Sequence, residues 1–209
     1  MPTIRINSQE STGQTPKALG LKLSWNPAAQ KAIADIRSRY PAERSRSALI
    51  PLLWLAQREF GGWLSVDAMQ LVAETLELPY IRVYEVASFY TMFNLQPVGK
   101  HHLQVCTNCA CMVRGSDAIV KTITEELHIT NGETTPDGLF TLTEVECLGA
   151  CVAAPMMQVG THYFTNLDVK KTQRLLQALK KNDPKTLAEF TDTPPAEVDP
   201  ITHADYPTS

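Results

Sequence analysis

Apolar residues in the first half of the chain recur with the period of amphipathic helices. Asn26 followed by Pro27 is a cap residue with proline at the first helical position, and Pro41 ends that run. Three more helices are expected, over about 47–60, 65–78 and 80–89. Gly61-Gly62 and Pro79 separate them. Residues 25–97 are therefore predicted to form a helical bundle.

The pattern changes after the break at residues 96–99. The expected elements are a strand at 103–106, a helix capped by Ser116, a strand at 140–146, a hairpin of 156–159 with 162–164, and a helix after Asp168. The order strand–helix–strand–strand–helix is that of a small thioredoxin-like α/β layer. The predicted fold class is α+β, with the helical bundle followed by a thioredoxin-like domain at 98–182.

The two ends of the chain carry no pattern of a packed element. Residues 1–24 are polar and are expected to be a flexible lead-in; they lack the basic and apolar regions of a secretory signal. Residues 183–209 hold five prolines and scattered acids, and an extended tail without a core is expected there.

Composition narrows the class of protein further. The 209 residues are 44% hydrophobic and 20% charged, as in ordinary globular proteins, and the net charge of −3 gives no attraction to nucleic acid. No apolar run approaches the roughly 18–20 residues that span a bilayer, so direct membrane insertion is not expected. We expect a cytoplasmic chain, in which cysteines serve thiol chemistry or metal binding.

Four of the five cysteines form two pairs, and none lies outside residues 106–151. Four residues separate Cys106 from Cys111, three separate Cys147 from Cys151, and thirty-five lie between the pairs. This spacing lets each segment supply two thiolates to one iron, so a [2Fe-2S] cluster is the preferred cofactor. Small residues in the run 147–155 let backbone N–H groups approach the cluster sulfurs.

Other interpretations of the cysteines stay open. Structural zinc usually has ligands two residues apart in both pairs, which these gaps do not match. A redox dithiol of Cys106 and Cys109 would leave the other three cysteines without a role. Inert core cysteines would not gather within one short region. His101 and His102 precede the first pair and are interpreted as residues at the start of a strand.

No catalytic constellation stands out in the sequence. The ten glycines form neither a G-x-G-x-x-G motif nor a P-loop, and no Ser/His/Asp or paired-carboxylate set is visible. No catalytic residue is assigned. A cluster without a substrate site acts as an electron relay, and a relay needs partners.

The motifs around the cysteines resemble the thioredoxin-like [2Fe-2S] subunit of respiratory complex I, which is the E subunit of bacterial NADH-quinone oxidoreductase. The matching segments are 105–106, 111–117, 132–138, 146–151 and 154–156, with Val86-Ala87-Ser88-Phe89-Tyr90-Thr91-Met92-Phe93 as a helical-domain signature. The resemblance covers about residues 25–180. Cys106, Cys111, Cys147 and Cys151 match the four ligands of the family one for one, whereas Cys109 is a departure.

The resemblance implies an electron-transfer subunit in the peripheral arm of NADH-quinone oxidoreductase. It would contact the subunit that holds FMN and binds NADH, together with other peripheral-arm subunits, on the cytoplasmic face of the inner membrane. The chain alone would not oxidise NADH. Alternatives are a diaphorase subunit of an NAD-linked hydrogenase or formate dehydrogenase and, from another class, a zinc-stapled interaction module.

Overall fold

The computed structural model describes residues 16–182 and divides between Pro97 and Val98 into two units. The expected tail at 183–209 and residues 1–15 of the expected lead-in lie outside this range. None of the helices in the described range is long and apolar enough to cross a membrane.

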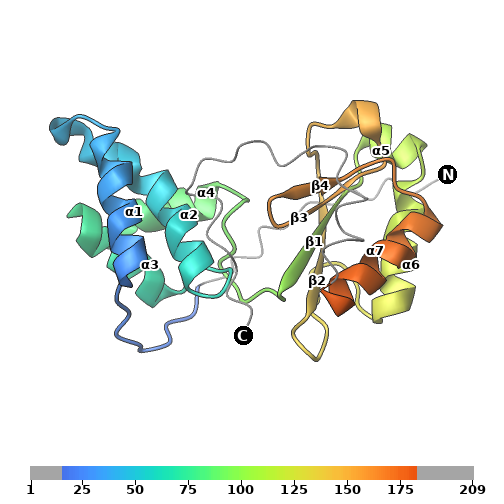
Figure 1. Cartoon of the computed structure of the whole chain (residues 1–209), viewed down its shortest axis with the longest axis horizontal. Coiled ribbons are helices and arrows are strands. Elements are labelled where there is room, and N and C mark those ends of the chain that lie inside the picture. The colour runs from blue at the N-terminus through green and yellow to red at the C-terminus, as the bar shows by residue number, and fades with distance from the viewer. Residues whose placement is uncertain (1–15, 183–209) are drawn as a thin grey trace. The chain divides into compact units, whose positions relative to one another are not determined.

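Helices make up the regular structure of the first unit within residues 16–97 (Figure 1). They are α1 (Pro27–Ser38), the 3₁₀ helix η1 (Ala42–Ala48), α2 (Leu49–Glu59), α3 (Val66–Leu76) and α4 (Tyr80–Phe89). Two starts follow the capping rule: the Asn26 side chain accepts from the Ala29 N–H at 2.7 Å, and Ser65 Oγ accepts from the Ala68 N–H at 3.1 Å. The helix η1 was not predicted, because its polar sequence carries no apolar period.

The first unit buries the apolar faces of α2 and α3. Leu52 and Leu53 of α2 and Met69 and Val72 of α3 are fully buried, and α3 also packs on α4. Burial of each such side chain stabilises the unit by about 1.5–3 kcal/mol. Part of the expected flexible lead-in is bonded here, since the Lys17 carbonyl accepts from the first N–H of α3 at 3.1 Å.

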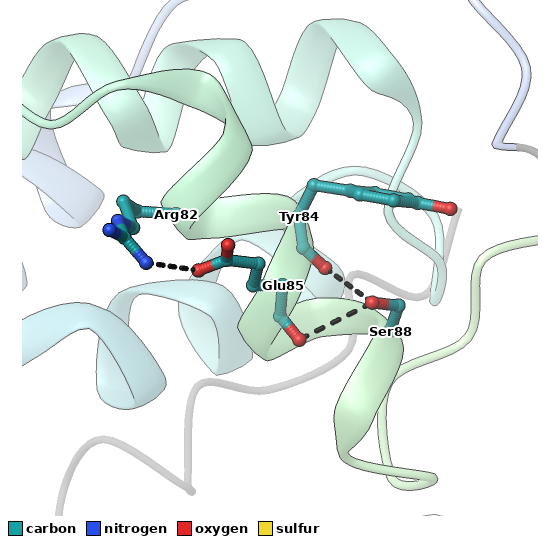
Figure 2. A network of polar contacts seen from close by, with 4 residues as sticks. All are labelled: Arg82, Tyr84, Glu85 and Ser88. Atoms are coloured by element: carbon teal, nitrogen blue, oxygen red, sulfur yellow. Dashed lines mark hydrogen bonds and ion pairs between the residues drawn. The ribbon is translucent and has the colours of Figure 1, made fainter.

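Helix α4 carries polar contacts along its exposed side (Figure 2). The Arg82 guanidinium pairs with the Glu85 carboxylate at 2.8 Å, and Ser88 Oγ donates to the Tyr84 carbonyl at 2.7 Å. The aromatic residues 89–93, at and just beyond the end of α4, are divided between core and surface. Phe93 is 5% exposed and packs on Trp54, whereas Phe89 is 76% exposed.

A four-stranded sheet forms the centre of the second unit. Its strands are β1 (His101–Cys106), β2 (Phe140–Val145), β3 (Met157–Val159) and β4 (His162–Phe164), in the spatial order β2-β1-β3-β4. Strands β1 and β2 are parallel, and the other neighbours are antiparallel. Gly99 is required beside β2, because a Cβ there would meet the Phe140 backbone at 2.7 Å.

Helices α6 (Ser116–Leu127) and α7 (Val169–Lys181) lie side by side against the sheet (Figure 1). Alternate strand residues such as Leu103 and Leu142 point to the same core as Ile123 and Leu176 of the helices. Two short helices, α5 (Cys109–Val113) and the 3₁₀ helix η2 (Cys151–Ala153), interrupt the connections after β1 and β2. This unit is a mixed helix-and-sheet fold.

The four predicted strands are all present, and both strands of the predicted hairpin join the sheet. One predicted helix cap was wrong. Ser116 is not the cap of α6: Gly115 occupies that position with φ +95°, a value that favours glycine. Asp168 was placed correctly and caps α7 by accepting from the Lys171 N–H at 2.8 Å.

Candidate metal centre

The two cysteine pairs follow neighbouring parallel strands. Strand β1 ends at Cys106, which lies opposite Val145 at the end of β2, and Cys147 comes two residues later. The Thr107 N–H donates to the Val145 carbonyl at 3.2 Å and continues the pairing beyond the strands. Parallel strands end at the same edge of a sheet, so both cysteine-bearing segments begin there.

The first cysteine segment (residues 106–113) turns directly into helix α5. The Asn108 side chain accepts from the Cys109 N–H at 2.6 Å and starts this helix. Cys109 is the first residue of this helix, which at five residues is too short to show a periodic pattern in the sequence. Residues two apart on a helix point about 200° apart. Cys109 is accordingly exposed and Cys111 is buried.

The second cysteine segment (residues 147–155) lies at the surface. Cys147 and Cys151 are both exposed. The Gly149 N–H donates to Cys147 Sγ at 3.3 Å, and Gly149 adopts φ +77°, where glycine is favoured. A backbone N–H directed at a thiolate stabilises its negative charge, as cluster ligands require.

A small apolar cluster joins the first segment to the end of the second. It contains Cys106, Cys111, Ala154 and Met156, none more than 3% exposed. The Cys106 N–H also donates to the Met156 carbonyl at 3.2 Å. The two thiols therefore lie in a dry environment within this cluster.

The pKa of the Cys111 thiol reflects its burial and the neighbouring cysteines. Burial raises the pKa of the Cys111 thiol to about 11, and the hydrogen bond and charge of Cys106 contribute to that rise. Cys151 of the second segment adds to the same effect by its charge. The structure thus buries Cys106 and Cys111 in one cluster, while Cys147 and Cys151 follow the end of β2 at the same edge of the sheet.

The donor set fits a [2Fe-2S] cluster. Five thiols lie at or just after the ends of the two strands, four of them in the two pairs, and an all-cysteine set of four is the usual ligation of such a cluster. Within residues 16–182 no three His, Cys, Asp or Glu side chains converge as ligands of one metal ion. A [2Fe-2S] cluster asks for two protein ligands at each of its irons, so two pairs suffice.

Sequence reasoning did not identify two polar side chains that touch the second cysteine segment. Arg114 Nε donates to the Ala154 carbonyl at 2.7 Å, and Tyr163 OH donates to the Leu148 carbonyl at 3.0 Å. These pairs are 40 and 15 positions apart along the chain. No local pattern in the sequence signals such contacts.

Two histidines and two glutamates in or next to β1 and β2 differ in their position and burial. His101 and His102 lie in β1 at the end away from Cys106, which confirms their interpretation as residues at the start of a strand. Glu146, just after β2, is exposed, whereas Glu144 within β2 is partly buried. Burial and the nearby Asp117 charge raise the pKa of Glu144.

The chain matches a known protein family over most of its length. The model of the thioredoxin-like [2Fe-2S] ferredoxin family matches residues 33–180. Among characterised proteins, the chain is 53% identical over 148 residues to the E subunit of NADH-quinone oxidoreductase from Rickettsia bellii, covering 71% of this chain and 89% of that protein. It is 48% identical over 165 residues to the mitochondrial NADH dehydrogenase [ubiquinone] flavoprotein 2 of Dictyostelium discoideum, covering 79% of this chain and 67% of the relative.

Solved structures show a similar fold. A crystal structure of an air-oxidised NAD⁺-reducing [NiFe]-hydrogenase superposes with a TM-score of 0.59 at 20% identity. The match covers 70% of this chain and 26% of the hydrogenase chain. At this identity the likeness concerns the fold.

Proposed function

The chain belongs to the thioredoxin-like [2Fe-2S] ferredoxin family, and we propose that it is the E subunit of NADH-quinone oxidoreductase, the electron-transfer subunit with one [2Fe-2S] cluster. The observation that carries this proposal is the pair of cysteine segments at one edge of the sheet, in a chain 53% identical to such subunits. Its activity belongs to the oxidoreductase complex, in which FMN and NADH bind a partner subunit.

The proposed ligands are the four paired cysteines. Cys106 and Cys111 would hold one iron from within the apolar cluster, and Cys147 and Cys151 would hold the other from the surface. Exposed Cys109 would remain free. When bound, the cluster takes up and returns one electron. Burial of the first pair keeps water from one side of the site, and exposure of the second pair leaves the other side open to a partner.

Exposed apolar side chains support a docked partner at this site. Met112, Val113 and Val152 flank the cysteines in both segments and are 52%, 82% and 98% exposed. Apolar groups gathered at a surface mark protein contacts. The proposed occupant is the flavoprotein subunit, since an electron passes between flavin and cluster only when the two lie close. Other peripheral-arm subunits would complete the assembly.

The remaining features of the proposal concern the complex as a whole. The first unit would act as a helical bundle that holds no ligand, and its exposed Phe89 is a candidate contact with a partner. The complex would place the chain peripherally on the cytoplasmic face of the inner membrane. A diaphorase role in a hydrogenase is a second candidate, since a hydrogenase chain shares the fold, but the relatives about 50% identical favour NADH-quinone oxidoreductase.

Affinity purification of the full-length chain from its native cells tests this proposal. An FMN-containing subunit should co-purify, and NADH should reduce the preparation. The isolated chain should not oxidise NADH, because no nucleotide-binding loop occurs in the sequence. Purification without any flavoprotein, or NADH turnover by the chain alone, would contradict the assignment.

A further inference from the structure

Arg114 connects the two cysteine segments through one side-chain hydrogen bond. It ends helix α5 three residues after Cys111. Its Nε donates to the Ala154 carbonyl at 2.7 Å, and Ala154 is fully buried in the apolar cluster with Cys106 and Cys111. Arg114 itself is exposed, and its Nε contacts this cluster through the Ala154 carbonyl.

The Ala154 carbonyl occupies a particular place among its neighbours. The carbonyls of Ala153 and Pro155 accept backbone N–H groups of Asn166 and Leu167 at 2.8 and 3.0 Å. Between them, the Ala154 carbonyl faces the first cysteine segment and accepts a side-chain donor instead. A buried carbonyl that lost its donor would cost roughly 1–3 kcal/mol. Arg114 therefore supplies the hydrogen-bond donor for the Ala154 carbonyl, which faces the first cysteine segment.

The Arg114–Ala154 hydrogen bond matters most for the second cysteine segment, which is the less buried of the two. Cys147 and Cys151 are exposed, so packing alone does not fix their segment. The backbone bond from Cys106 to Met156 and the Arg114 bond to Ala154 lie on either side of Pro155. Together they tie the end of the second segment to the first.

We propose that Arg114 is a positioning residue: it sets the spacing between the two cysteine pairs, and its charge favours the reduced cluster. The proposal rests on the proposed function, because it requires the cluster. Arginine stays charged at all working pH values. A reduced cluster carries one more negative charge than the oxidised form, and a fixed cation nearby stabilises that form.

Three variants of the full-length, cluster-loaded chain separate these effects. Arg114→Gln removes the charge, Arg114→Lys keeps it, and the control Lys121→Gln removes a charge from exposed Lys121 of α6, whose pairing with Glu125 is loose at 3.8 Å. The measurements are the midpoint potential from an EPR-monitored redox titration and the rate of cluster loss in a chelator.

Arg114→Gln should shift the potential to more negative values, alter the EPR line shape and speed cluster loss several-fold. Arg114→Lys should restore most of the potential and only part of the kinetic stability, because lysine keeps the charge but has no N–H donor at the position of the arginine Nε. Lys121→Gln should match the parent.

Three results would overturn the proposal: an Arg114→Gln variant identical to the parent, an equal shift in Lys121→Gln, or a metal-free Arg114→Gln variant with reduced helical circular dichroism, which would mark a merely structural role. A parent chain that holds no cluster would instead refute the proposed function.

Discussion

Cys109 and Cys111 lie two positions apart, yet their side chains have opposite surroundings. Cys109 begins α5 at the surface, whereas Cys111 is 2% exposed and lies within reach of Cys106. We predict that Cys109→Ala keeps the visible spectrum and iron content of the parent and that Cys111→Ala loses most of both. Each tetrahedral iron takes two protein ligands, so a fifth thiol has no open site.

The two alanine variants serve as controls for each other, because each removes one sulfur from the same five-residue helix. The measurement is the iron content and visible absorption of both purified proteins. Loss of the cluster from Cys109→Ala with retention in Cys111→Ala would mean that the first pair is Cys106 and Cys109.

His102 is a second residue whose surroundings predict a measurable effect. It is partly buried in β1 beside Thr143 Oγ1 at 2.8 Å, and burial lowers the pKa of His102 to about 4. The unfolded chain takes up this proton near pH 6.5 and the folded chain only near pH 4. The contribution of neutral His102 to the stability of the folded chain is therefore complete above pH 6.5 and is lost as the pH falls towards 4.

Between pH 7 and pH 5 this histidine should lower the free energy of unfolding by at most about 2 kcal/mol. Urea unfolding of the metal-free chain at both pH values measures the change, and His102→Gln should reduce it. Burial also lowers the pKa of His101, which accounts for part of the remaining pH dependence. Exposed His162→Gln is the matched control. A pH dependence that stays the same in His102→Gln would contradict this account.

At the scale of the elements, two buried serines near helix starts differ in what they do. Ser65 caps α3 through its bond to the Ala68 N–H, whereas Ser116 Oγ in α6 has no hydrogen-bond partner within residues 16–182. Ser65→Ala should lower the free energy of unfolding by about 1 kcal/mol. Ser116→Ala should not lower it, because a buried hydroxyl without a partner gives no stabilisation. Thermal unfolding of both variants measures these changes. A loss of stability in Ser116→Ala equal to that in Ser65→Ala would contradict the assignment of Gly115 as the cap.

The elements that could be predicted from the sequence are those set by local rules. The caps Asn26, Ser65 and Asp168 stand where their helices begin, since each acts on an N–H three residues away. The missed helix α5 is too short to show a period. The cap at Gly115 was missed because Ser116 next to it is the usual type of cap residue, whereas Gly115 takes the cap position through its positive φ.

The same distinction holds for the candidate site. Cysteine spacing alone indicates two pairs, and strand pairing then explains why both reach one edge of the sheet. The contacts of Arg114 and Tyr163 join segments far apart in the sequence, so only the folded chain reveals them. The burial of one pair and the exposure of the other likewise follow from packing.

At the scale of the whole molecule, the two units carry separate cores. The first unit buries its own residues, such as Leu53 and Met69, and all four proposed ligands belong to the second unit. Metal binding is coupled to folding, so Cys151→Ser should lose or severely weaken the cluster and destabilise the second unit. The first unit should keep its helices, and limited proteolysis should release a resistant fragment of about residues 25–97.

Cys109→Ser serves as the control for that experiment, since it makes the same change at an exposed thiol outside the proposed ligand set. Unfolding of both units together in Cys151→Ser would contradict their independence. A native cluster spectrum in both Cys151→Ser and Cys147→Ser would contradict the assignment of the second pair.

The central claim is that this chain holds one [2Fe-2S] cluster for electron transfer. The most direct test is the metal and sulfide content of the purified full-length chain, with its visible spectrum. We predict a red-brown protein with about two irons and two acid-labile sulfides per chain, reducible to a state with a [2Fe-2S] EPR signal. A colourless protein with stoichiometric zinc and no sulfide would contradict the account.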